Sequence, residues 1–400
     1  MQEYSIYLHI PFCHYRCSYC DFNTYSGLEE LIPAYSQALC AEIRFMGENN
    51  HLRLPVHTVF LGGGTPSLLP ITELDRLLQV LREEVDLIEG VEITLEANPE
   101  RLSLDYLKGL HALGINRLSL GMQSANSEDL QLLERQHDYR QVTTVVKEAR
   151  KACIENINID LILGIPHQTL SSWKTSLEFG LSLDPDHLSL YALTVEKGTL
   201  LADWITKGLL VAPDPDLAAE MYEWASERLD QRGFKQYEIS NWARFDTTNG
   251  LLVCKHNLQY WRNLSYIGLG AGAHGFFGGR RTANVRSPNE YIQRFQSTKG
   301  DRDRSHLIFP STPATDKSHV VDREQEMRET MMMGLRLTGE GISRSEFRAR
   351  FHTSIEDVFN NEIEELLRFG LLEWKPPDND RLRLTPRGRL LGNQMFIRFI

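Results

Sequence analysis

The stretch Cys13-His-Tyr-Arg-Cys17-Ser-Tyr-Cys20 places three thiols in one loop, directly after the run Ser5 to Ile10, which predicts a strand. Packing alone does not explain this spacing, so the loop indicates a metal centre rather than unrelated core cysteines. Three thiolates can hold three irons of a [4Fe–4S] cluster and leave the fourth iron open to a small molecule. Zinc is the alternative, with His9 or His14 as a possible fourth ligand.

The first half of the chain alternates short apolar runs with longer segments of helical period, such as 28–47 and 71–85. This alternation is typical of βαβ units and predicts an α/β fold with a partial TIM-like (βα)6 barrel. Parallel strands bring their carboxyl ends to one rim, where such folds place their chemistry. The expected strands are Ser5 to Ile10, Val56 to Leu61, Val91 to Glu96, Asn116 to Gly121, Ile157 to Gly164 and His187 to Leu193.

Polar or flexible residues stand at the ends of several of these strands. The stretch Gly62-Gly-Gly-Thr-Pro66 follows the second strand, and glycines let a backbone approach a ligand closely, although a tight turn would use them too. Glu96, Gln123 and Asp160 lie at later strand ends. Each alone is more typical of a cap or a surface charge. Together they predict a site for a charged nucleoside near the cysteine loop.

Cys-x3-Cys-x2-Cys after an amino-terminal strand resembles the signature of the radical S-adenosylmethionine superfamily. The resemblance implies a [4Fe–4S] cluster on the three cysteines, with S-adenosylmethionine at the open iron. Glu96 suits the ammonium or sulfonium, Arg135 the carboxylate, and Gln123 and Asp160 the ribose hydroxyls. The positions that match the superfamily's cofactor-binding residues are Tyr7, Tyr19, Gly63, Gly64, Thr65, Glu96, Gln123, Arg135 and Asp160.

Within the superfamily, His9-Ile-Pro-Phe-Cys13 and Asn158-Ile-Asp-Leu-Ile-Leu-Gly-Ile-Pro166 resemble the group of oxygen-independent coproporphyrinogen oxidase. The oxidase has a further cysteine where this chain has Phe22, and it has an extra amino-terminal segment. These differences point to the HemW-like haem chaperones, whose His-Asn-x-x-Tyr-Trp pattern is similar to the segment from His256 to Trp261.

His256 is therefore a candidate haem ligand, because neutral imidazole is a common axial ligand of haem iron. A core histidine satisfied by one hydrogen bond remains the alternative. Cys254 is either a soft ligand or, more simply, a small buried residue. Cys40 and Cys153 are expected in the core, and the glycines between Gly268 and Gly275 are expected in a close-approach loop rather than a dinucleotide fingerprint.

The function expected from the resemblance is that of a haem chaperone, which binds haem and delivers it to client proteins. The alternative is a coproporphyrinogen III oxidase that performs radical oxidative decarboxylation, and a third possibility is a zinc-stabilised binding module. Conventional turnover is not expected for a chaperone, and no residue is assigned a catalytic role. A homodimer is a further possibility.

The chain is expected to form a radical SAM core over residues 1–240 and a barrel-closing, haem-binding region over 241–296. Within these, a helix is expected over 214–232 and strands over 236–240 and 251–260. The polar stretch 297–325 predicts a linker. Residues 326–400 are expected to form a smaller helical domain that resembles a winged helix, with a hairpin joined through Pro376 to Asp380.

Composition limits the remaining function classes. Apolar residues make up 42% of the chain and charged residues 24%, which is ordinary for a globular protein, and no apolar run is long enough to span a membrane. A net charge of −11 disfavours broad nucleic-acid binding. The amino terminus lacks the features of a signal peptide, so a cytoplasmic location is expected.

Overall fold

The computed structural model describes residues 3–50, 53–100, 102–296 and 307–400. Its internal contacts divide the chain into a first unit, Met1–Ala225 with Ser265–His319, and a second unit, Ser226–Leu264 with Val320–Ile400. Residues 297–306, the first part of the predicted linker 297–325, lie outside the described residues. The boundaries expected at 240, 296 and 325 remain predictions.

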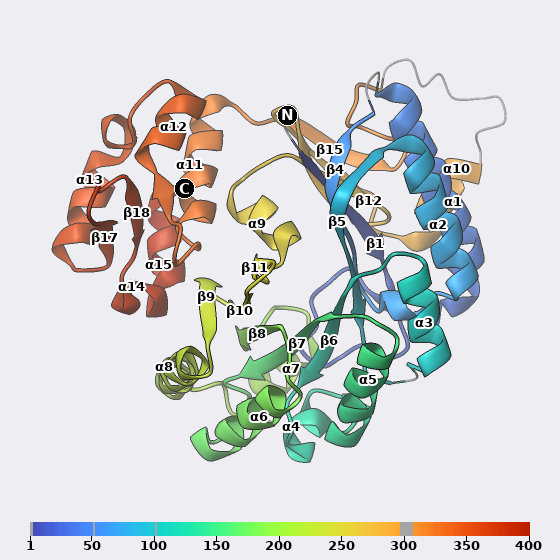
Figure 1. The fold of residues 1–400 in the computed structure, drawn as a ribbon, viewed down its shortest axis with the longest axis horizontal. Coiled ribbons are helices and arrows are strands. Elements are labelled where there is room, and N and C mark those ends of the chain that lie inside the picture. The colour runs from blue at the N-terminus through green and yellow to red at the C-terminus, as the bar shows by residue number, and fades with distance from the viewer. Residues whose placement is uncertain (1–2, 51–52, 101, 297–306) are drawn as a thin grey trace. The chain divides into compact units, whose positions relative to one another are not determined.

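The first unit is built on a parallel sheet that contains the six expected strands (Figure 1). Their order is β8-β7-β6-β5-β4-β1, and each neighbouring pair is parallel. This arrangement confirms the predicted α/β barrel-like sheet. The bounds are β1 Tyr4–Ile10, β4 Pro55–Gly63, β5 Asp86–Ala97, β6 Arg117–Gln123, β7 Asn156–Leu163 and β8 His187–Ala192.

Beyond β1 the sheet gains a parallel strand that the sequence did not predict. This strand, β12, pairs with β1 and brings the glycine-rich segment after it next to the start of the chain. Antiparallel strands β13 and β14 then follow, and β15 lies next to β14. The bounds are β12 Tyr266–Leu269, β13 His274–Phe277, β14 Arg280–Asn284 and β15 Thr315–Val320.

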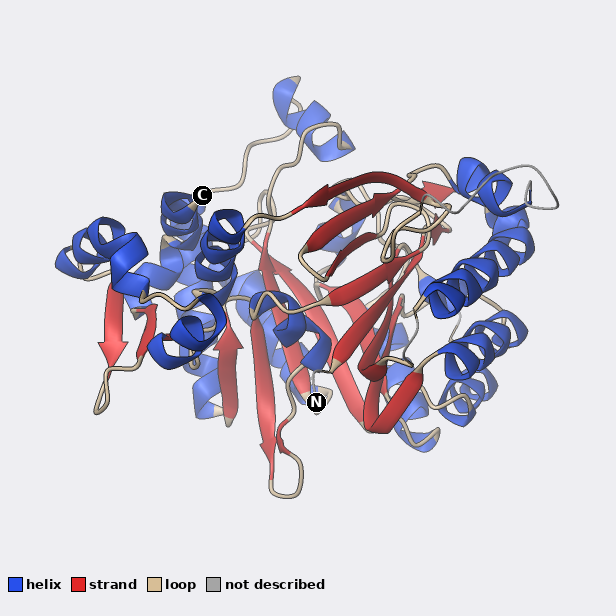
Figure 2. Ribbon diagram, turned by 90° about the horizontal axis from the view of Figure 1, so that it is seen from above, coloured by secondary structure: helices blue, strands red, loops and turns tan. Residues whose placement is uncertain are grey.

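Helices α1 to α6 lie along the outer side of this sheet (Figures 1 and 2). Their starts are fixed locally: Asp138 with Gln141 and Thr169 with Ser172 form capping boxes at α5 and α6. The helices of this unit are α1 Ile32–Asn49, α2 Ile71–Glu84, α3 Leu104–Ala112, α4 Ser127–Leu132, α5 Tyr139–Lys151, α6 Leu170–Ser182, α7 Leu200–Thr206 and α10 Pro288–Gln296. Helix α8, Pro215–Gln231, crosses the boundary between the units.

The second unit contains the predicted small helical domain. Its three-stranded antiparallel sheet has the order β16-β18-β17 and includes the expected hairpin. The buried side chains Met331, Phe347, Phe359 and Phe399 form part of its core. The elements are β9 Phe234–Glu238, β10 Asn241–Asp246, β11 Gly250–Leu251, α9 Lys255–Trp261, α11 Arg323–Gly334, β16 Ile342–Ser343, α12 Arg344–Phe351, α13 Ile355–Arg368, β17 Leu372–Lys375, β18 Arg381–Leu384, α14 Pro386–Leu390 and α15 Gly392–Phe396.

Two local predictions are wrong. The strand expected over 251–260 is for the most part helix α9, because the apolar run ends at Val253 and the buried His256 and Gln259 recur at helical spacing. Cys153 is exposed rather than in the core, because α5 ends at Lys151 and Cys153 turns the chain with a φ of 64°. Cys40 is buried in α1, as predicted.

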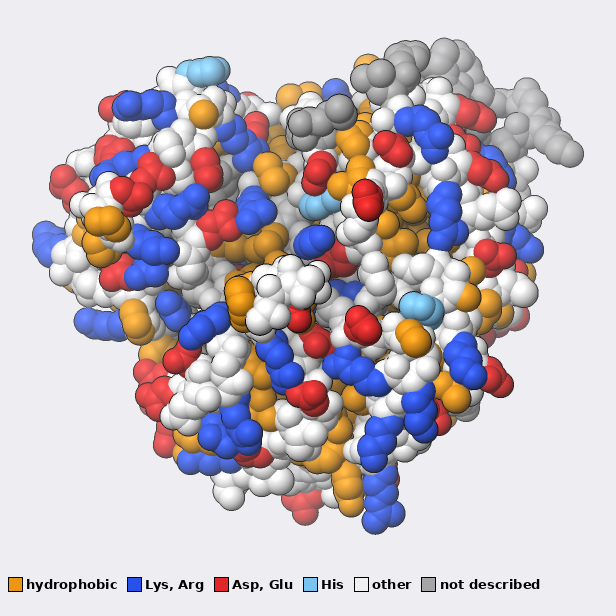
Figure 3. Space-filling view, viewed as in Figure 1, with side chains coloured by type: hydrophobic (Ala, Val, Ile, Leu, Met, Phe, Trp, Pro, Cys, Tyr) orange, Lys and Arg blue, Asp and Glu red, His pale blue; other side chains and the backbone are white. Residues whose placement is uncertain are grey.

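Two further expectations concern the distribution of charge on the surface and the presence of membrane-spanning helices. On the face seen in Figure 3, acidic and basic side chains are interspersed. Among the described residues, no helix combines the length and the apolar character that a membrane span requires.

Candidate functional site

The three thiols lie in a loop that a short parallel pairing closes. Strand β2, Phe12–Cys13, pairs with β3, Tyr25–Ser26, so the chain enters and leaves the loop side by side. Each sulfur has a polar neighbour. Thr65 Oγ1 donates to Cys13 Sγ at 3.6 Å, Arg135 Nη1 donates to Cys17 Sγ at 3.5 Å, and Cys20 Sγ lies 3.8 Å from Thr24 Oγ1. Donors near sulfur favour the thiolate form that metals require.

Burial opposes this effect in the metal-free protein. Burial raises the pKa of Cys13 to about 11, and it also raises the pKa of Cys20. A thiol must lose its proton to become a metal ligand, so metal loading here has to release protons.

The glycine stretch packs directly against the entrance of this loop. Gly64 N donates to Ile10 O at 2.8 Å, and Thr65 N donates to Phe12 O at 2.7 Å. A Cβ at Gly64 would lie 2.5 Å from the Phe12 carbonyl oxygen, so no other residue fits without a shift of the backbone. The end of β4 and the cysteine loop therefore form one structure.

Arg135, from the loop after α4, links the cluster loop to two strand ends. Its Nη2 donates to Asn98 Oδ1 and to Gly121 O, both at 2.7 Å, while its Nη1 contacts Cys17. Among the described residues, its buried Nε has no hydrogen-bond partner. A buried guanidinium with an unused donor suits a ligand carboxylate.

Glu96, near the end of β5, and Asp160, in the middle of β7, are two partly buried carboxyl groups whose charges act on each other. Glu96 Oε2 accepts from Gly63 N at 3.0 Å, which joins it to the glycine stretch. Burial, followed by the charge of Asp160, raises the pKa of Glu96 to about 7, and burial also raises the pKa of Asp160. A cation such as an ammonium or sulfonium would relieve this cost.

Tyr7 connects the carboxyl pair to the cluster loop through His9. The Tyr7 hydroxyl lies 2.9 Å from His9 Nδ1, and His9 Nε2 lies 2.9 Å from Asn23 O. Since a carbonyl oxygen can only accept, His9 Nε2 carries the proton and Tyr7 donates to Nδ1. Burial and the charge of Glu96 raise the pKa of Tyr7, so the phenol stays protonated.

Gln123 and Tyr19 complete the predicted set in the first unit. Gln123 ends β6 with a φ of 65°, a strained backbone of the kind often held at functional sites. Tyr19 lies in the cysteine loop, and burial raises the pKa of its hydroxyl. The charge of Cys17 raises this pKa further, while the charge of Arg135 opposes the rise. The structure thus places Glu96 and Gln123 near the carboxyl ends of β5 and β6, whereas Tyr7 and Asp160 lie in the middle of β1 and β7 rather than at strand ends.

Sequence reasoning missed several polar residues of this site. Asn98 donates from its Nδ2 to Thr65 Oγ1 at 3.3 Å and so joins the glycine stretch to Arg135. Its sequence signal was its place two residues after Glu96, directly beyond the end of β5. Arg117 is only 2% exposed, and its positive charge acts on both Glu96 and Asp160. This charge partly offsets the effect of burial, which raises the pKa of both carboxyl groups. The local sequence gave no signal for Arg117, because a basic residue at the start of a strand is usually a surface charge.

Asp160 itself is held by its neighbours. Ser119 Oγ donates to Asp160 Oδ2 at 3.1 Å, and Asn158 Nδ2 donates to Oδ1 at 2.8 Å. A hydrogen bond with Ser189 also acts on this carboxylate, and a carboxylate with about four acceptor sites and three such partners can still accept from one ligand hydroxyl. The carboxylate is therefore fixed in position and retains accepting capacity.

His256 lies on α9 and belongs to the second unit. Its ring is 1% exposed, and its Nε2 lies 2.8 Å from the Tyr260 hydroxyl, one helical turn later. This contact is what a satisfied core histidine shows, and binding of iron through Nε2 would have to replace it. Cys254, at the start of the same helix, is buried.

The residues of the first unit suit a [4Fe–4S] cluster with a small zwitterionic ligand. Within the described ranges, no three His, Cys, Asp or Glu side chains converge on one point as the ligands of a single ion do. The cysteines of a cubane each bind a different iron, so their sulfurs stand apart around the cluster. Next to the thiols lie a carboxylate pair for a cation and a guanidinium for a carboxylate.

Two family models and several known proteins match this chain. A model of the radical SAM superfamily matches residues 7–180, and a model of the HemN C-terminal domain matches residues 321–391. The chain is 37% identical to the heme chaperone HemW of Bacillus subtilis, over 99% of both chains. It is 38% identical to the mouse mitochondrial radical S-adenosyl methionine domain-containing protein 1, over 92% of this chain and 81% of that one. The solved structure of coproporphyrinogen III oxidase HemN from Escherichia coli, a radical SAM enzyme, is similar with a TM-score of 0.81 and 25% identity, over 99% of this chain and 90% of that one.

Proposed function

This chain belongs to the HemW heme chaperone family of radical SAM proteins, and from that premise we propose that it binds haem and delivers it to client proteins. The family carries a [4Fe–4S] cluster and S-adenosylmethionine. We place the cluster on Cys13, Cys17 and Cys20. A reducing compartment such as the cytoplasm suits the six cysteines, all of which are free thiols.

The observation that carries the proposal is the similarity to HemW along the whole chain, because it spans both units and the His256 segment. Phe22 supports it. Its ring is 63% exposed beside the cysteine loop, where the oxidases have a further cysteine. We also propose that His256 contacts haem. For this contact, the hydrogen bond between His256 Nε2 and the Tyr260 hydroxyl has to break.

The residues of the first unit have separate tasks around the cluster and its ligand. Cys13, Cys17 and Cys20 would hold the [4Fe–4S] cluster, which would supply electrons at low potential. Glu96 binds the cationic part of S-adenosylmethionine, and Arg135 binds its carboxylate. Gly63 and Gly64 let the backbone approach the methionine amino group, while Gln123 and Asp160 hold the ribose. Tyr7 and Tyr19 exclude water beside the loop.

Reconstitution tests the cluster. The chain should bind four irons under anaerobic conditions, and a Cys13→Ala/Cys17→Ala/Cys20→Ala variant should bind none. Cys153→Ala is the matched control, because that thiol is exposed and outside the site. Zinc without iron in the reconstituted wild type would overturn the cluster assignment.

Haem titration and transfer test the chaperone function. The chain should form a stable haem complex and pass haem to an apo-haem protein, and His256→Ala should weaken binding. His111→Ala, at an exposed histidine of α3, should behave as the wild type does. A wild-type chain that binds no haem would contradict the proposal.

Oxidation of coproporphyrinogen III is the second candidate function, favoured by the structural likeness to HemN over nearly the whole chain. Incubation with coproporphyrinogen III, S-adenosylmethionine and a reductant, followed by product analysis, separates the two. We expect no oxidative decarboxylation at enzymatic turnover, and such turnover would replace the chaperone proposal.

A further inference from the structure

The second unit contains an open cavity of about 680 Å³, and none of the residues that line it belongs to the first unit. This volume is within the range of sites for cofactor-sized molecules. Its apolar wall includes Trp261, Phe347 and Ile342, and its polar wall includes Arg262, Arg381 and Glu340. Trp261 is the last residue of α9, the helix that carries His256. The cavity therefore combines apolar side chains with cations.

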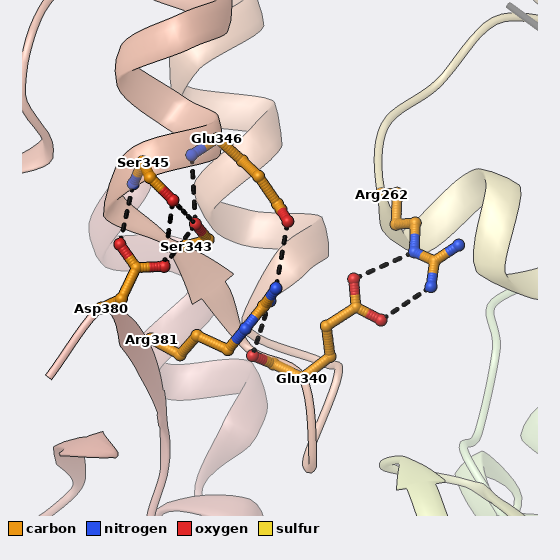
Figure 4. A network of polar contacts seen from close by, with 7 residues as sticks. All are labelled: Arg262, Glu340, Ser343, Ser345, Glu346, Asp380 and Arg381. Carbon is orange, nitrogen blue, oxygen red and sulfur yellow. Dashed lines mark hydrogen bonds and ion pairs between the residues drawn. The ribbon is translucent and has the colours of Figure 1, made fainter. Parts of the chain in front are cut away.

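Two arginines of the cavity converge on Glu340 (Figure 4). The Arg262 guanidinium donates to both Glu340 carboxylate oxygens, from Nε at 3.0 Å and from Nη2 at 2.8 Å. Arg381 Nη1 donates to the Glu340 main-chain oxygen at 3.3 Å, and its Nη2 donates to Glu346 Oε1 at 3.0 Å. Both arginines are thus already arranged to hold carboxylates.

The rim that presents Arg262 is fixed by a third arginine. Arg350 Nη2 donates to Asn263 O at 2.7 Å and to Glu326 Oε1 at 2.6 Å. This contact anchors the turn after α9 from the side of α12. Arg262 is therefore presented by a fixed backbone.

The pair between Arg262 and Glu340 is easily exchanged. The two side chains are 43% and 30% exposed, and ion pairs this accessible to water contribute little to stability. The outer partner of Arg381, Glu346, has a side chain that is 67% exposed. A ligand carboxylate can take the place of either glutamate at small cost.

We propose that this cavity binds the carboxylate-bearing edge of haem, with Arg262 and Arg381 receiving its two propionates. The macrocycle packs on Trp261, Phe347 and Ile342, since a planar apolar ring gains most from such walls. The Glu340 carboxylate holds Arg262 until the ligand displaces it. The inference rests on the proposed haem chaperone function and adds a site for the propionates, separate from any iron ligand.

Substitutions on the two sides of one ion pair should act in opposite directions. In full-length protein, Arg262→Gln should weaken haem binding roughly fivefold, because a charged partner of a propionate is lost. Glu340→Gln should tighten binding roughly threefold, because the competitor for Arg262 is lost. A purely structural role of the pair would make both substitutions weaken binding or leave it unchanged.

The matched control is Arg328→Gln. Arg328 pairs with Glu324 on the surface of α11, in the same unit, and it does not line the cavity. This variant should bind haem as the wild type does. In the Arg262→Gln background, the gain from Glu340→Gln should vanish, because the two substitutions act on one interaction.

Metal-free protoporphyrin IX and its dimethyl ester separate this site from the iron ligand. Binding of the free acid should keep its dependence on Arg262 and Glu340 but not respond to His256→Ala, while the ester should bind equally to all variants. Haem binding that Arg262→Gln and Glu340→Gln leave unchanged, or change in the same direction, would overturn the site and leave the chaperone function standing. A wild-type chain that binds no haem would overturn both.

Discussion

Replacing Glu96 by glutamine should stabilise the ligand-free protein while it damages ligand binding. Burial and the neighbouring Asp160 raise the Glu96 pKa from its ordinary 4.5 to about 7. The folded chain then holds this proton more tightly than the unfolded chain does, so the free energy of unfolding falls as pH rises from about 4.5 to about 7. Above pH 7 the loss amounts to about 3 kcal/mol.

Glu96→Gln removes the titrating group and keeps an oxygen that can accept from Gly63 N. At pH 8 the metal-free variant should therefore unfold at higher urea, with a gain of up to about 3 kcal/mol, and near pH 4 the two proteins should be equally stable. After cluster reconstitution, calorimetry should show S-adenosylmethionine binding weakened by more than about tenfold, since its cationic part loses a carboxylate.

Glu100→Gln is the control, because its effect should have the opposite sign. His137, whose Nδ1 lies 3.7 Å from Glu100 Oε1, lowers the Glu100 pKa, so the ionised form stabilises the fold. Its replacement should lower stability at pH 8 and have little effect at low pH. The reasoning would be refuted by a Glu96→Gln variant that is less stable than the wild type at pH 8. A difference in the free energy of unfolding that does not change with pH would refute it as well.

Three further substitutions test the frame of the site. Gly64→Ala should lower the urea midpoint of unfolding by the equivalent of about 2 kcal/mol and reduce cluster yield, because its Cβ meets the Phe12 carbonyl, whereas Gly339→Ala, at an open position, should do neither. Arg135→Lys should retain the charge but lose the hydrogen bonds to Asn98 and Gly121. We expect a higher Kd for S-adenosylmethionine and a shifted EPR spectrum of the cluster in its presence. An unchanged Kd for S-adenosylmethionine would argue against the carboxylate-binding role of Arg135. Glu42→Leu should cost about 3 to 5 kcal/mol in urea unfolding, since Glu42 Oε1 and Oε2 accept hydrogen bonds from four groups in the buried interior, and a loss below about 1 kcal/mol would contradict that estimate.

The sequence by itself determined the cluster loop, the glycine stretch and the parallel sheet. These features are local, because a ligand spacing, a turn or a period-two run is written in neighbouring residues. The expected strands placed Glu96 and Gln123 near the carboxyl ends of β5 and β6, since parallel strands end on the same side, but Asp160 lies in the middle of β7, because that strand continues to Leu163.

Only the tertiary structure decided which polar groups meet. Arg117 acts on Glu96 and Asp160, which are distant from it in the sequence, and no local pattern marks such an interaction. Strand β12 was missed because four residues carry little periodic signal, although its pairing with β1 positions the glycine loop after it.

The second unit shows the same division. The motif from His256 to Trp261 was visible in the sequence, but its apolar approach predicted a strand where the chain forms α9. As a helix, the segment turns His256 onto Tyr260 and places Trp261 on a cavity whose cations come from residues 262 and 381. A binding cavity is formed by segments that are distant in sequence, and for that physical reason only the folded chain reveals it.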